Sequence, residues 1–511
     1  MGAITRSPWV PGEMAGSESS RDRRGPSEGS GLVIGRRQLS LAELWAFVAV
    51  AIPVLALMVP KLSTIDLAYQ VRAGNIMLHT HRLLSTDLFS FTARGEAWLN
   101  QQWGAEVLWA LLYRVGGWPM LILTRALLAG AVAACVFLAC RARGAGTKPA
   151  AWLTIASFAV WLPGAILRPQ LLGLLLFALT LWLLSDRERH PARLWWIPAI
   201  VVVWANLHGS FFLAPVLVAL AWLQARARHE DRAKAGRLVR VGFASMLAAN
   251  VNPYGLRVWR YAVGIPANRV IADTIVEWRP PTVRTGPGLV FFLSLAVVAL
   301  LLARRGRLAP WPTLVAIGLF FLIGLFAVRG IYWWALAVPP LLVELLPERL
   351  PHRLAQDPRS PANTALAGMI LLLVLILLPW WRTGGSGGPD ALLDHAPRGV
   401  TASLASVLRP GDRMFNPELW GSWFEFRFPR TPVFDDSRIE VFSARVWNQY
   451  DQVSGAADGW QQVLDAWRIR VVVASRSQQG SLIAAIRSDP GWRLLHEDDE
   501  GLVFVRSDQA P

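Results

Sequence analysis

The sequence contains little cysteine and almost no lysine. Its two cysteines, Cys135 and Cys140, lie five positions apart in one apolar run. On a helix they point in different directions, so they cannot form a normal disulfide, and they lack the further ligands of a zinc site. Lysine occurs only at Lys61, Lys148 and Lys234, so arginine carries nearly all of the positive charge. Cysteine use therefore gives no information about the redox compartment.

Several motifs that accompany nucleotide or zinc chemistry are also missing. The chain has no G-x-G-x-x-G fingerprint, no Walker A sequence and no H-E-x-x-H pair. These are the usual marks of dinucleotide, nucleoside triphosphate and zinc-protease sites. No repeat of about 20–50 residues is present either, which argues against solenoids and propellers.

Hydrophobic residues are abundant instead. They make up 54% of the 511 residues, and the mean hydropathy of +0.37 is too high for a soluble protein of this size. The long apolar runs predict a polytopic α-helical membrane protein with about eleven transmembrane helices. The predicted spans are residues 41–60, 118–140, 150–167, 170–185, 194–206, 210–225, 238–251, 288–303, 309–327, 330–346 and 363–381.

The net charge of +16 does not indicate a nucleic-acid partner, because most arginines lie in short loops between apolar runs. By the positive-inside rule these loops face the cytoplasm. The opposite loops, including residues 61–117 and 252–287, are then extracytoplasmic, as is everything after residue 381. This pattern predicts a multi-pass membrane protein with a cytoplasmic N-terminus. The basic loops contain Arg141, Arg143 and Lys148; Arg187, Arg189 and Arg193; Arg226, Arg228, Arg232, Lys234, Arg237 and Arg240; Arg304, Arg305 and Arg307; and Arg349, Arg353 and Arg359.

Composition divides the chain into four parts. Residues 1–40 are rich in Gly, Ser, Pro and Arg and are predicted to be a disordered cytoplasmic tail. Residues 41–381 form the transmembrane domain, whose first run is expected to be a retained signal anchor. Residues 382–389 are a Gly-rich linker, and residues 390–511 are expected to form a small extracytoplasmic α/β domain.

Within this last domain, three patterns predict local structure. The β-branched run at residues 469–474 suits a buried strand, and residues 479–487 suit an amphipathic helix. Residues 492–495 and 502–505 flank an acidic turn and predict a hairpin.

Asp66 is the first acidic residue after the first apolar run. It begins a predicted surface helix, residues 65–78, which Thr64 can cap. A carboxylate in this place can simply stabilise the helix dipole, or it can act as a general base for an acceptor hydroxyl.

Three further acids follow in the same predicted outer loop. Asp87 fits a turn and Glu106 fits the first turn of a helix, but both are also candidates for a catalytic site. Glu96 lies beside Gly95 in a predicted hairpin tip and is expected to be solvated.

Three basic residues lie at very short predicted outer turns: Arg168, His208 and Arg329. Ionisable groups at membrane depth cost about 2.5–3.5 kcal/mol each on insertion scales, so they are functional candidates. Arg and His donate charge-assisted hydrogen bonds that suit a lipid-linked phosphate. The alternatives are snorkelling of the arginines to headgroups and plain packing of the histidine.

The longer outer loop, residues 252–287, carries a basic aromatic patch. Arg257, Trp259, Arg260 and Tyr261 follow an Asn-Pro-Tyr-Gly turn. The patch suits an isoprenoid phosphate, and it equally suits anchoring at the membrane surface.

Taken together, these segments resemble the GT-C class of integral-membrane glycosyltransferases. The likeness is to bacterial relatives of the dolichyl-phosphate-mannose protein mannosyltransferase and lipid A aminoarabinose transferase group, and it covers nearly the whole chain. The matching pieces are Asp66-Leu67, Arg72-Ala73-Gly74, Ser85-Thr86-Asp87-Leu88-Phe89-Ser90, Trp98, Gln102-Trp103, Glu106, Arg168-Pro169-Gln170, Asn206-Leu207-His208-Gly209, Asn252-Pro253-Tyr254-Gly255, Glu277-Trp278 and Phe434-Asp435-Asp436-Ser437-Arg438.

The resemblance implies an inverting transfer of a sugar from a polyprenyl phosphate to a lipid or glycan acceptor outside the cytoplasm. It maps the catalytic base onto Asp66, with Asp87 or Glu106 assisting. Arg168, His208, Arg257 and Arg329 would then bind the donor phosphate. It assigns no residue to a metal and leaves the use of a divalent cation open.

Two other functions remain open at this point. A flippase for lipid-linked saccharides would carry charges deep in its spans and an inverted repeat, and the sequence shows neither. A non-catalytic scaffold with the same fold is favoured by Gln70, which stands where such relatives often have histidine, and by the missing Asp-Glu pair in the first loop.

Overall fold

The computed structural model describes residues 38–267, 276–346, 359–383 and 388–507. Residues from Leu39 onward form one compact unit. Nearly all of the tail that was predicted to be disordered, and part of the predicted linker, lie outside the described residues.

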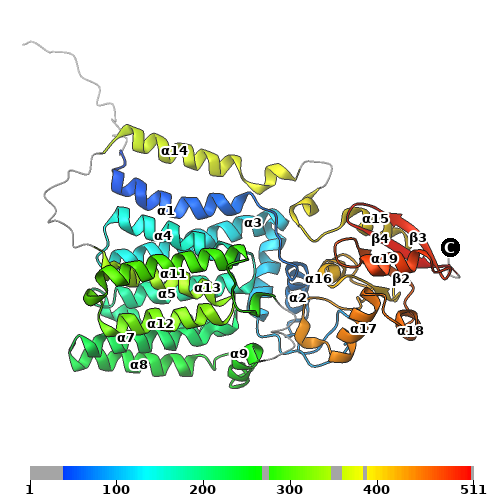
Figure 1. Ribbon diagram of the computed structural model, residues 1–511, viewed down its shortest axis with the longest axis horizontal. Helices are drawn as coiled ribbons and strands as arrows, with labels where there is room; N and C mark the ends of the chain where they lie inside the picture. Colours follow the sequence, from blue (N-terminus) through cyan, green and yellow to red (C-terminus); the bar gives the residue numbers. More distant parts are fainter. Residues whose placement is uncertain (1–37, 268–275, 347–358, 384–387, 508–511) are drawn as a thin grey trace, which may run out of the picture. The chain divides into compact units, whose positions relative to one another are not determined.

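Each of the eleven predicted apolar segments contains a helix. These helices form a bundle on one side of the molecule, apart from the C-terminal sheet (Figure 1). They are α1(Leu41–Met58), α3(Trp103–Ala142), α4(Thr147–Trp161), α5(Pro169–Ser185), α6(Trp196–Ala205), α7(Leu213–Ala227), α8(Arg232–Ala248), α11(Gly286–Arg305), α12(Trp311–Phe326), α13(Gly330–Leu342) and α14(Pro361–Ile376).

Short 3₁₀ turns join or extend several of these helices. They are η1(Leu162–Gly164), η2(Pro191–Trp195), η3(Gly209–Phe212), η4(Val276–Trp278), η5(Gly306–Leu308), η6(Val343–Leu345), η7(Pro379–Arg382), η8(Pro389–Leu392) and η9(Ile439–Val441).

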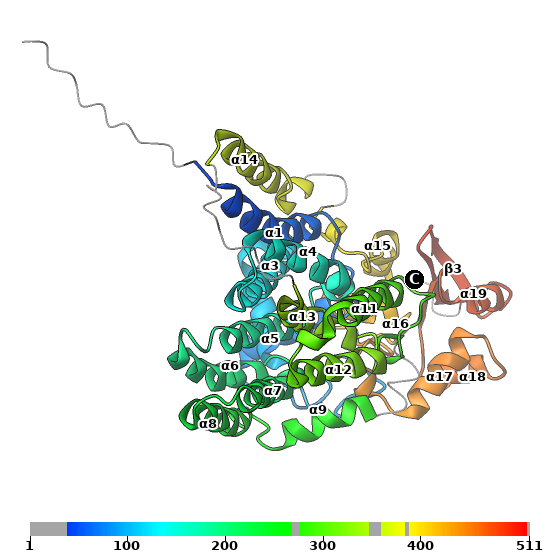
Figure 2. The same ribbon diagram turned by 60° about the vertical axis from the view of Figure 1, so that its left-hand side comes forward.

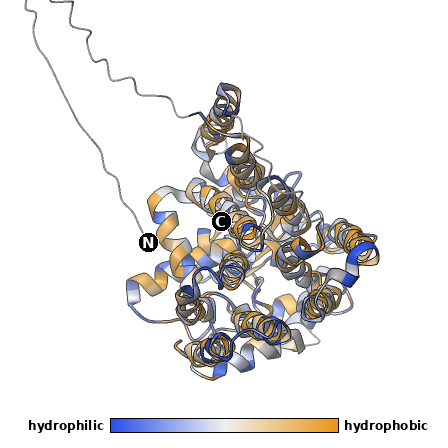
Figure 3. Ribbon diagram, turned by 90° about the vertical axis from the view of Figure 1, so that its left-hand side faces the viewer, coloured by the Kyte–Doolittle hydropathy of each residue, from blue (hydrophilic) through white to orange (hydrophobic). Residues whose placement is uncertain are grey.

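Four described helical segments are long and apolar enough to cross a membrane: Leu41–Met58, Trp103–Ala142, Gly209–Ala227 and Gly286–Arg305. Hydrophobic residues spread around the helices instead of forming a single inward stripe (Figure 3). On α14, for example, Ala367 is the one buried residue of a helix made mostly of Leu, Ile and Met. Such helices need an apolar solvent, which supports a multi-pass membrane protein. The number of about eleven spans stays a prediction.

A kink in α3 separates the predicted first outer loop from the bundle. Gly117 has φ +62°, a left-handed conformation that favours glycine, and Pro119 follows it. The first part of α3 therefore belongs with α2(Leu67–Thr80), against which it packs. A Cβ at Gly74 would collide with the Glu106 backbone, so glycine lets these two helices approach closely.

The C-terminal region contains the predicted small sheet. Its strands, β1(Met414–Phe415), β2(Val471–Ser475), β3(Trp492–Glu497) and β4(Gly501–Arg506), lie in the order β1-β2-β4-β3. β2 is fully buried, and β3 and β4 form the predicted hairpin. The accompanying helices are α15(Arg398–Val407), α16(Glu418–Arg427), α17(Ala444–Ser454), α18(Trp460–Ala466) and α19(Gly480–Arg487), the last where a helix was predicted.

The C-terminal region is bound to the first outer loop. The Tyr69 N–H in α2 donates to Ser422 Oγ in α16 over 2.8 Å. A further bridge joins Ser90 to Val433. α2 and α16 lie between the long helices and the sheet in Figure 1, and in the view turned by 60° the sheet again lies to one side of the long helices (Figure 2). This junction fixes the loop that carries Asp66.

Candidate functional site

Asp66 is the N-cap residue of α2, but its side chain does not cap the helix. The predicted cap, Thr64, is buried and its hydroxyl has no hydrogen-bond partner. Asp66 Oδ2 lies 3.1 Å from Arg168 Nε instead, and its side chain is 19% exposed. The carboxylate is therefore positioned by an ion pair from outside its own helix.

Arg168 begins a chain of ion pairs. Its Nη1 lies 2.7 Å from Glu277 Oε1, and Arg329 Nη2 lies 2.6 Å from Glu277 Oε2. Asp66, Arg168, Glu277 and Arg329 thus alternate in charge, and we call them the Asp66 chain. The predicted residues Asp66, Arg168 and Arg329 are brought together through Glu277, a residue that was not a candidate.

Backbone hydrogen bonds hold the Glu277–Arg329 end of this chain in place. The N–H of Arg329 donates to the Glu277 carbonyl over 3.1 Å, and the N–H of Val328 donates to the Arg279 carbonyl over 3.0 Å. α13 begins directly after Arg329, and a Cβ at Gly330 would collide with the Ile323 carbonyl. Glycine therefore permits the tight turn that presents Arg329.

The two arginines keep Glu277 ionised. Burial alone would raise the pKa of this carboxyl group, but Arg329 and Arg168 hold it below its usual value. Arg329 also stacks on Trp278, with 5.1 Å between its guanidinium carbon and the ring centre. The ion pair with Glu277 and the stacking on Trp278 together fix the plane of the Arg329 guanidinium.

His208 is held in one tautomer. Its Nδ1 accepts from the Ser210 backbone N–H over 3.2 Å and lies 2.8 Å from Ser210 Oγ. Since a backbone N–H can only donate, the ring proton is on Nε2. Burial, together with the charge of Arg329, lowers the pKa of His208 to about 3, so the ring is neutral at neutral pH.

A cavity of about 220 Å³ joins His208 and Arg329. Polar groups of Gln102, Gln170 and Tyr261 also line it. Its remaining walls are largely apolar and include Phe212, Trp278, Ile323, Phe326 and Trp333. The cavity can therefore take a largely apolar ligand that carries hydrogen-bond acceptors at one end.

Asp66 does not line this cavity itself. It is linked to the wall through Arg168, whose neighbour Gln170 does line it. Through ion pairs, Asp66 reaches the cavity by way of Arg168 and Glu277, which do not line it, and then Arg329, which does.

Glu106 lies in a second, smaller cavity of about 20 Å³ that shares Gln102 and Tyr261 with the first. Its side chain is buried, and Asn100 Nδ2 donates to its Oε2 over 2.6 Å. Glu440, from the C-terminal region, lines the same space. Two carboxyl groups from distant segments thus face one polar pocket beside the apolar cavity.

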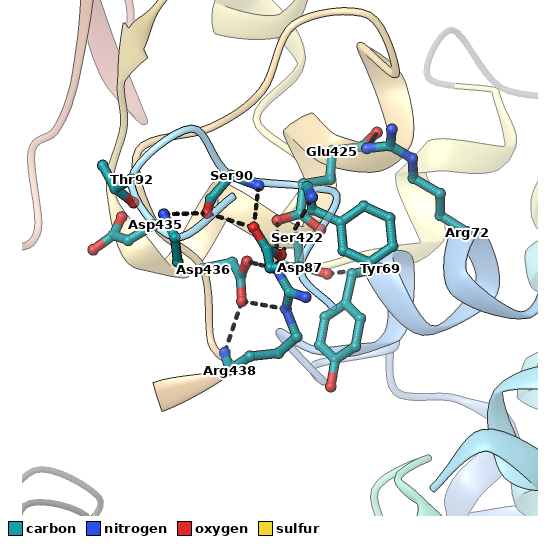
Figure 4. Close-up of polar contacts among 12 residues, drawn as sticks. Tyr69, Arg72, Asp87, Ser90, Thr92, Ser422, Glu425, Asp435, Asp436 and Arg438 are labelled. Carbon is teal, nitrogen blue, oxygen red and sulfur yellow. Dashed lines mark hydrogen bonds and ion pairs between the residues drawn. The ribbon is translucent and has the colours of Figure 1, made fainter. Parts of the chain in front are cut away.

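Asp87 lies in a different cluster of polar contacts (Figure 4). Its Oδ1 lies 2.7 Å from Arg438 Nη2, and its Oδ2 accepts from the backbone and hydroxyl of Ser90. Both Asp87 and Arg438 have side chains with 0% exposure. The carboxylate therefore has no access to a substrate in this structure.

Arg438 connects further groups to Asp87. It pairs with both oxygens of Asp436 and lies 3.8 Å from Glu425 Oε1. The rings of Tyr69, Phe89 and Trp98 surround it, at 5.4, 4.7 and 4.8 Å from the guanidinium carbon. We call Asp87, Glu425, Asp436 and Arg438 the Arg438 cluster, which connects the first outer loop to the C-terminal region.

Arg257 is the remaining predicted phosphate ligand. It begins α9(Arg257–Ala267), is exposed, and does not line the cavity. Tyr261, one turn further along α9, does line it. The predicted patch thus contributes its tyrosine to the cavity, and Arg257 stays outside.

Sequence reasoning missed Glu277 and Glu440. Glu277 did carry a signal, since it stands beside Trp278 in one of the segments that resemble GT-C enzymes. Glu440 gave none, because only the fold brings it to Glu106. Among the described residues, no group of three or more His, Cys, Asp or Glu side chains is arranged to hold a metal ion.

Comparisons with known proteins identify the fold. No family model matches the chain, and no curated protein matches its sequence. The apo oligosaccharyltransferase of Archaeoglobus fulgidus is 13% identical with a TM-score of 0.54, and the match covers 91% of this chain and 74% of that one. Apo ArnT from Cupriavidus metallidurans is 15% identical with a TM-score of 0.51, over 91% and 98% of the two chains.

A third structure, the arabinofuranosyltransferase AftD from Mycobacteria, is 18% identical with a TM-score of 0.51. The match covers 92% of this chain but only 42% of AftD, so this chain spans less than half of that protein. All three are GT-C glycosyltransferases, so the GT-C fold expected from the sequence motifs is confirmed.

Proposed function

We propose that this chain, which has the GT-C fold of membrane glycosyltransferases, moves a sugar from a polyprenyl-phosphate donor to an extracytoplasmic lipid or glycan acceptor, inverting the anomeric carbon. One observation carries the proposal. The apolar cavity is lined by both Arg329 and His208, and a chain of ion pairs links Arg329 to the carboxylate of Asp66.

The cavity matches the two chemical parts of such a donor. Phe212, Phe326 and Trp333 offer apolar surface to an isoprenoid. Arg329 uses Nε and Nη2 on Glu277, so among the described residues its Nη1 is available to a phosphate oxygen. The Nε2–H of His208 supplies a second, neutral donor.

The reaction needs one proton transfer and one displacement. Asp66 accepts the proton of the acceptor hydroxyl as its oxygen attacks the anomeric carbon. The bond from that carbon to the phosphate oxygen breaks, and polyprenyl phosphate leaves with the electron pair. Arg329 and His208 stabilise the charge that develops on the leaving phosphate.

The other candidate residues support this site in different ways. Arg168 and Glu277 position Asp66 and Arg329 relative to each other. Glu106 and Glu440 face the smaller polar pocket and bind acceptor hydroxyls. Asp87 stabilises the attachment of the C-terminal region instead of taking part in the chemistry.

The arrangement of loops supports a place in a bacterial inner membrane. The Asp66 chain lies in the loops that the positive-inside rule assigns to the extracytoplasmic face. Membrane lipids are then its immediate surroundings, and the N-terminus is cytoplasmic.

A transfer assay with the full chain in lipid nanodiscs tests the proposal. Polyprenyl-phosphate sugars, each labelled in the sugar, are offered with a crude cell-envelope acceptor, and the same sugars are offered as nucleotide sugars. We expect label in the acceptor, and release of polyprenyl phosphate, with at least one lipid-linked donor and with no nucleotide sugar.

Movement of the lipid-linked sugar across proteoliposomes without bond cleavage would establish a flippase instead. If the folded chain neither transfers the sugar nor moves it across the membrane with any donor, the result would support the non-catalytic scaffold.

A further inference from the structure

Another polar pocket, distinct from the one beside Glu106, lies at the far end of the bundle from Asp66. Arg168 precedes α5 and Arg187 follows it, and the 17 residues of this helix span about 25 Å. The pocket has a volume of about 330 Å³, at the lower end of the range of small-ligand sites. It is lined where α3, α5, α7 and α13 end, so it is separate from the proposed transfer site.

Four arginines line this pocket: Arg143, Arg187, Arg189 and Arg228. They lie in or beside the basic loops from which the sequence predicted only the orientation of the chain in the membrane. Two of them are not simple surface charges, because the side chains of Arg143 and Arg187 are 12% and 8% exposed. Burying guanidinium groups is costly unless they have anionic partners.

The acids present do not balance these arginines. Glu344 pairs with Arg143 and Arg228, at 3.4 and 2.7 Å, and Glu230 pairs with Arg187 at 3.1 Å. Glu188 lies 3.7 Å from Arg228. Four guanidinium groups thus meet three carboxylates, which leaves a surplus of one positive charge.

Two groups at the pocket have no polar partner among the described residues. Arg187 Nε is buried and has no hydrogen-bond partner. Arg189 is exposed, and its side chain makes no ion pair with any described residue. A buried donor without an acceptor is uncommon in folded proteins and points to a bound group.

An apolar crevice of about 30 Å³ adjoins the pocket and shares Arg143 and Gln224 with it. Leu181, Leu217 and Leu341 are among the residues that line it. A ligand that fits both spaces carries an anionic group with a short apolar extension beside it.

We propose that this pocket binds the phosphodiester headgroup of an anionic membrane lipid, with the phosphate among Arg187, Arg189 and Arg228 and the first carbons of the lipid at the crevice. A phosphodiester carries one negative charge, equal to the surplus. Basic pockets between helices at a cytoplasmic membrane face suit such headgroups. The inference is independent of the transfer reaction.

Native mass spectrometry of the full chain in detergent tests the site, with phosphatidylglycerol, phosphatidylcholine and inorganic phosphate as probes. We expect phosphatidylglycerol to bind and the other two not to. The double variant Arg189→Gln/Arg228→Gln should weaken the binding of phosphatidylglycerol at least about tenfold, since two charge-assisted contacts are lost. The control Arg232→Gln/Arg240→Gln removes the same charge from exposed positions on α8 and should change it less than about twofold.

The single variant Arg189→Gln is the second test, because this exposed side chain has no structural ion pair to lose. It should keep the unfolding temperature of the wild type and still weaken phosphatidylglycerol binding. Equal losses in the α8 control would overturn the site, since they would reflect net charge alone. Binding of inorganic phosphate as tight as that of the lipid would overturn the lipid part of the proposal.

Discussion

Two clusters of arginine and carboxylate each include an acid of the first outer loop, and they differ in access. The Asp66 chain has side chains that are 16–31% exposed, and it ends at a cavity. The Arg438 cluster is built from the same residue types, but the side chains of Asp87, Glu425, Asp436 and Arg438 are all 0% exposed.

The difference shows that residue type alone does not identify the reactive carboxylate in this loop. A base must be accessible to its substrate, and the side chain of Asp66 is 19% exposed whereas that of Asp87 is fully buried. A buried ion cluster instead makes removal of any one member costly, because its partners are left charged and unsolvated. Substitutions in the Asp66 chain are therefore expected to change the rate of transfer, and substitutions in the Arg438 cluster are expected to change the stability of the fold.

Replacing Arg438 should give the largest loss of stability. The variant Arg438→Gln leaves Asp87 and Asp436 buried without a counter-charge, which should lower the free energy of unfolding by about 3–5 kcal/mol. Denaturant unfolding in detergent measures this loss. The control Arg430→Gln, at an exposed position nearby in the sequence, should stay within about 0.5 kcal/mol of the wild type. An unchanged midpoint for Arg438→Gln would contradict a structural cluster.

Replacing Arg329 should give a smaller but selective loss of activity. In Arg329→Gln the donor phosphate loses a charge-assisted hydrogen bond worth about 1.5–3 kcal/mol, so kcat/KM should fall about tenfold to a hundredfold. Donor titration in nanodiscs checks this value. Arg257→Gln is the matched control and should have little effect, because Arg257 lies outside the cavity. A larger loss of activity in Arg257→Gln than in Arg329→Gln would instead mean that the donor phosphate binds at α9.

Glu425 should give the smallest effect, visible in the pH dependence of stability. Burial, aided by the charge of Asp436, raises the pKa of Glu425 well above its usual value. The folded state then keeps a proton that the unfolded state releases above about pH 4.3, so this contribution to stability falls as pH rises.

The variant Glu425→Gln mimics the protonated side chain and should flatten that fall. Unfolding midpoints measured from about pH 5 to about pH 8 would show a smaller change than in the wild type, while exposed Glu96→Gln would follow the wild type. A steeper fall in Glu425→Gln would mean that Glu425 is ionised in the cluster.

Apolar runs were sufficient to predict the helices of the bundle, and an acidic turn between two short apolar runs predicted the C-terminal hairpin. Long apolar runs predicted segments such as α5 and α11, because hydrophobic length is a local property. The acidic turn at Asp498–Glu500 likewise predicted the hairpin of β3 and β4. The prediction that Thr64 caps this helix was wrong. Asp66 is the N-cap residue of α2 instead, and its side chain pairs with Arg168 from a distant segment.

The site could be predicted only in part. Arg168 and Arg329 were identified because charges at short membrane turns are costly, which is visible locally. The pairing of Asp87 with Arg438, and of Glu277 with two arginines, depends on segments far apart in the sequence. No local pattern reports such contacts, so the sequence could not show that Asp87 is buried in an ion cluster while Asp66 stays partly exposed.

The most direct test of the account compares Asp66→Asn with Asp87→Asn in two measurements on the same samples, sugar transfer from the lipid-linked donor and the unfolding midpoint. Asp66→Asn should lower kcat about 10²–10⁴-fold, as expected for loss of a general base, and leave the midpoint unchanged. Asp87→Asn should lower the midpoint and keep most of the transfer rate of the fraction that remains folded. If Asp66→Asn transfers sugar at the wild-type rate while Asp87→Asn is folded and inactive, the central assignment of the base is wrong.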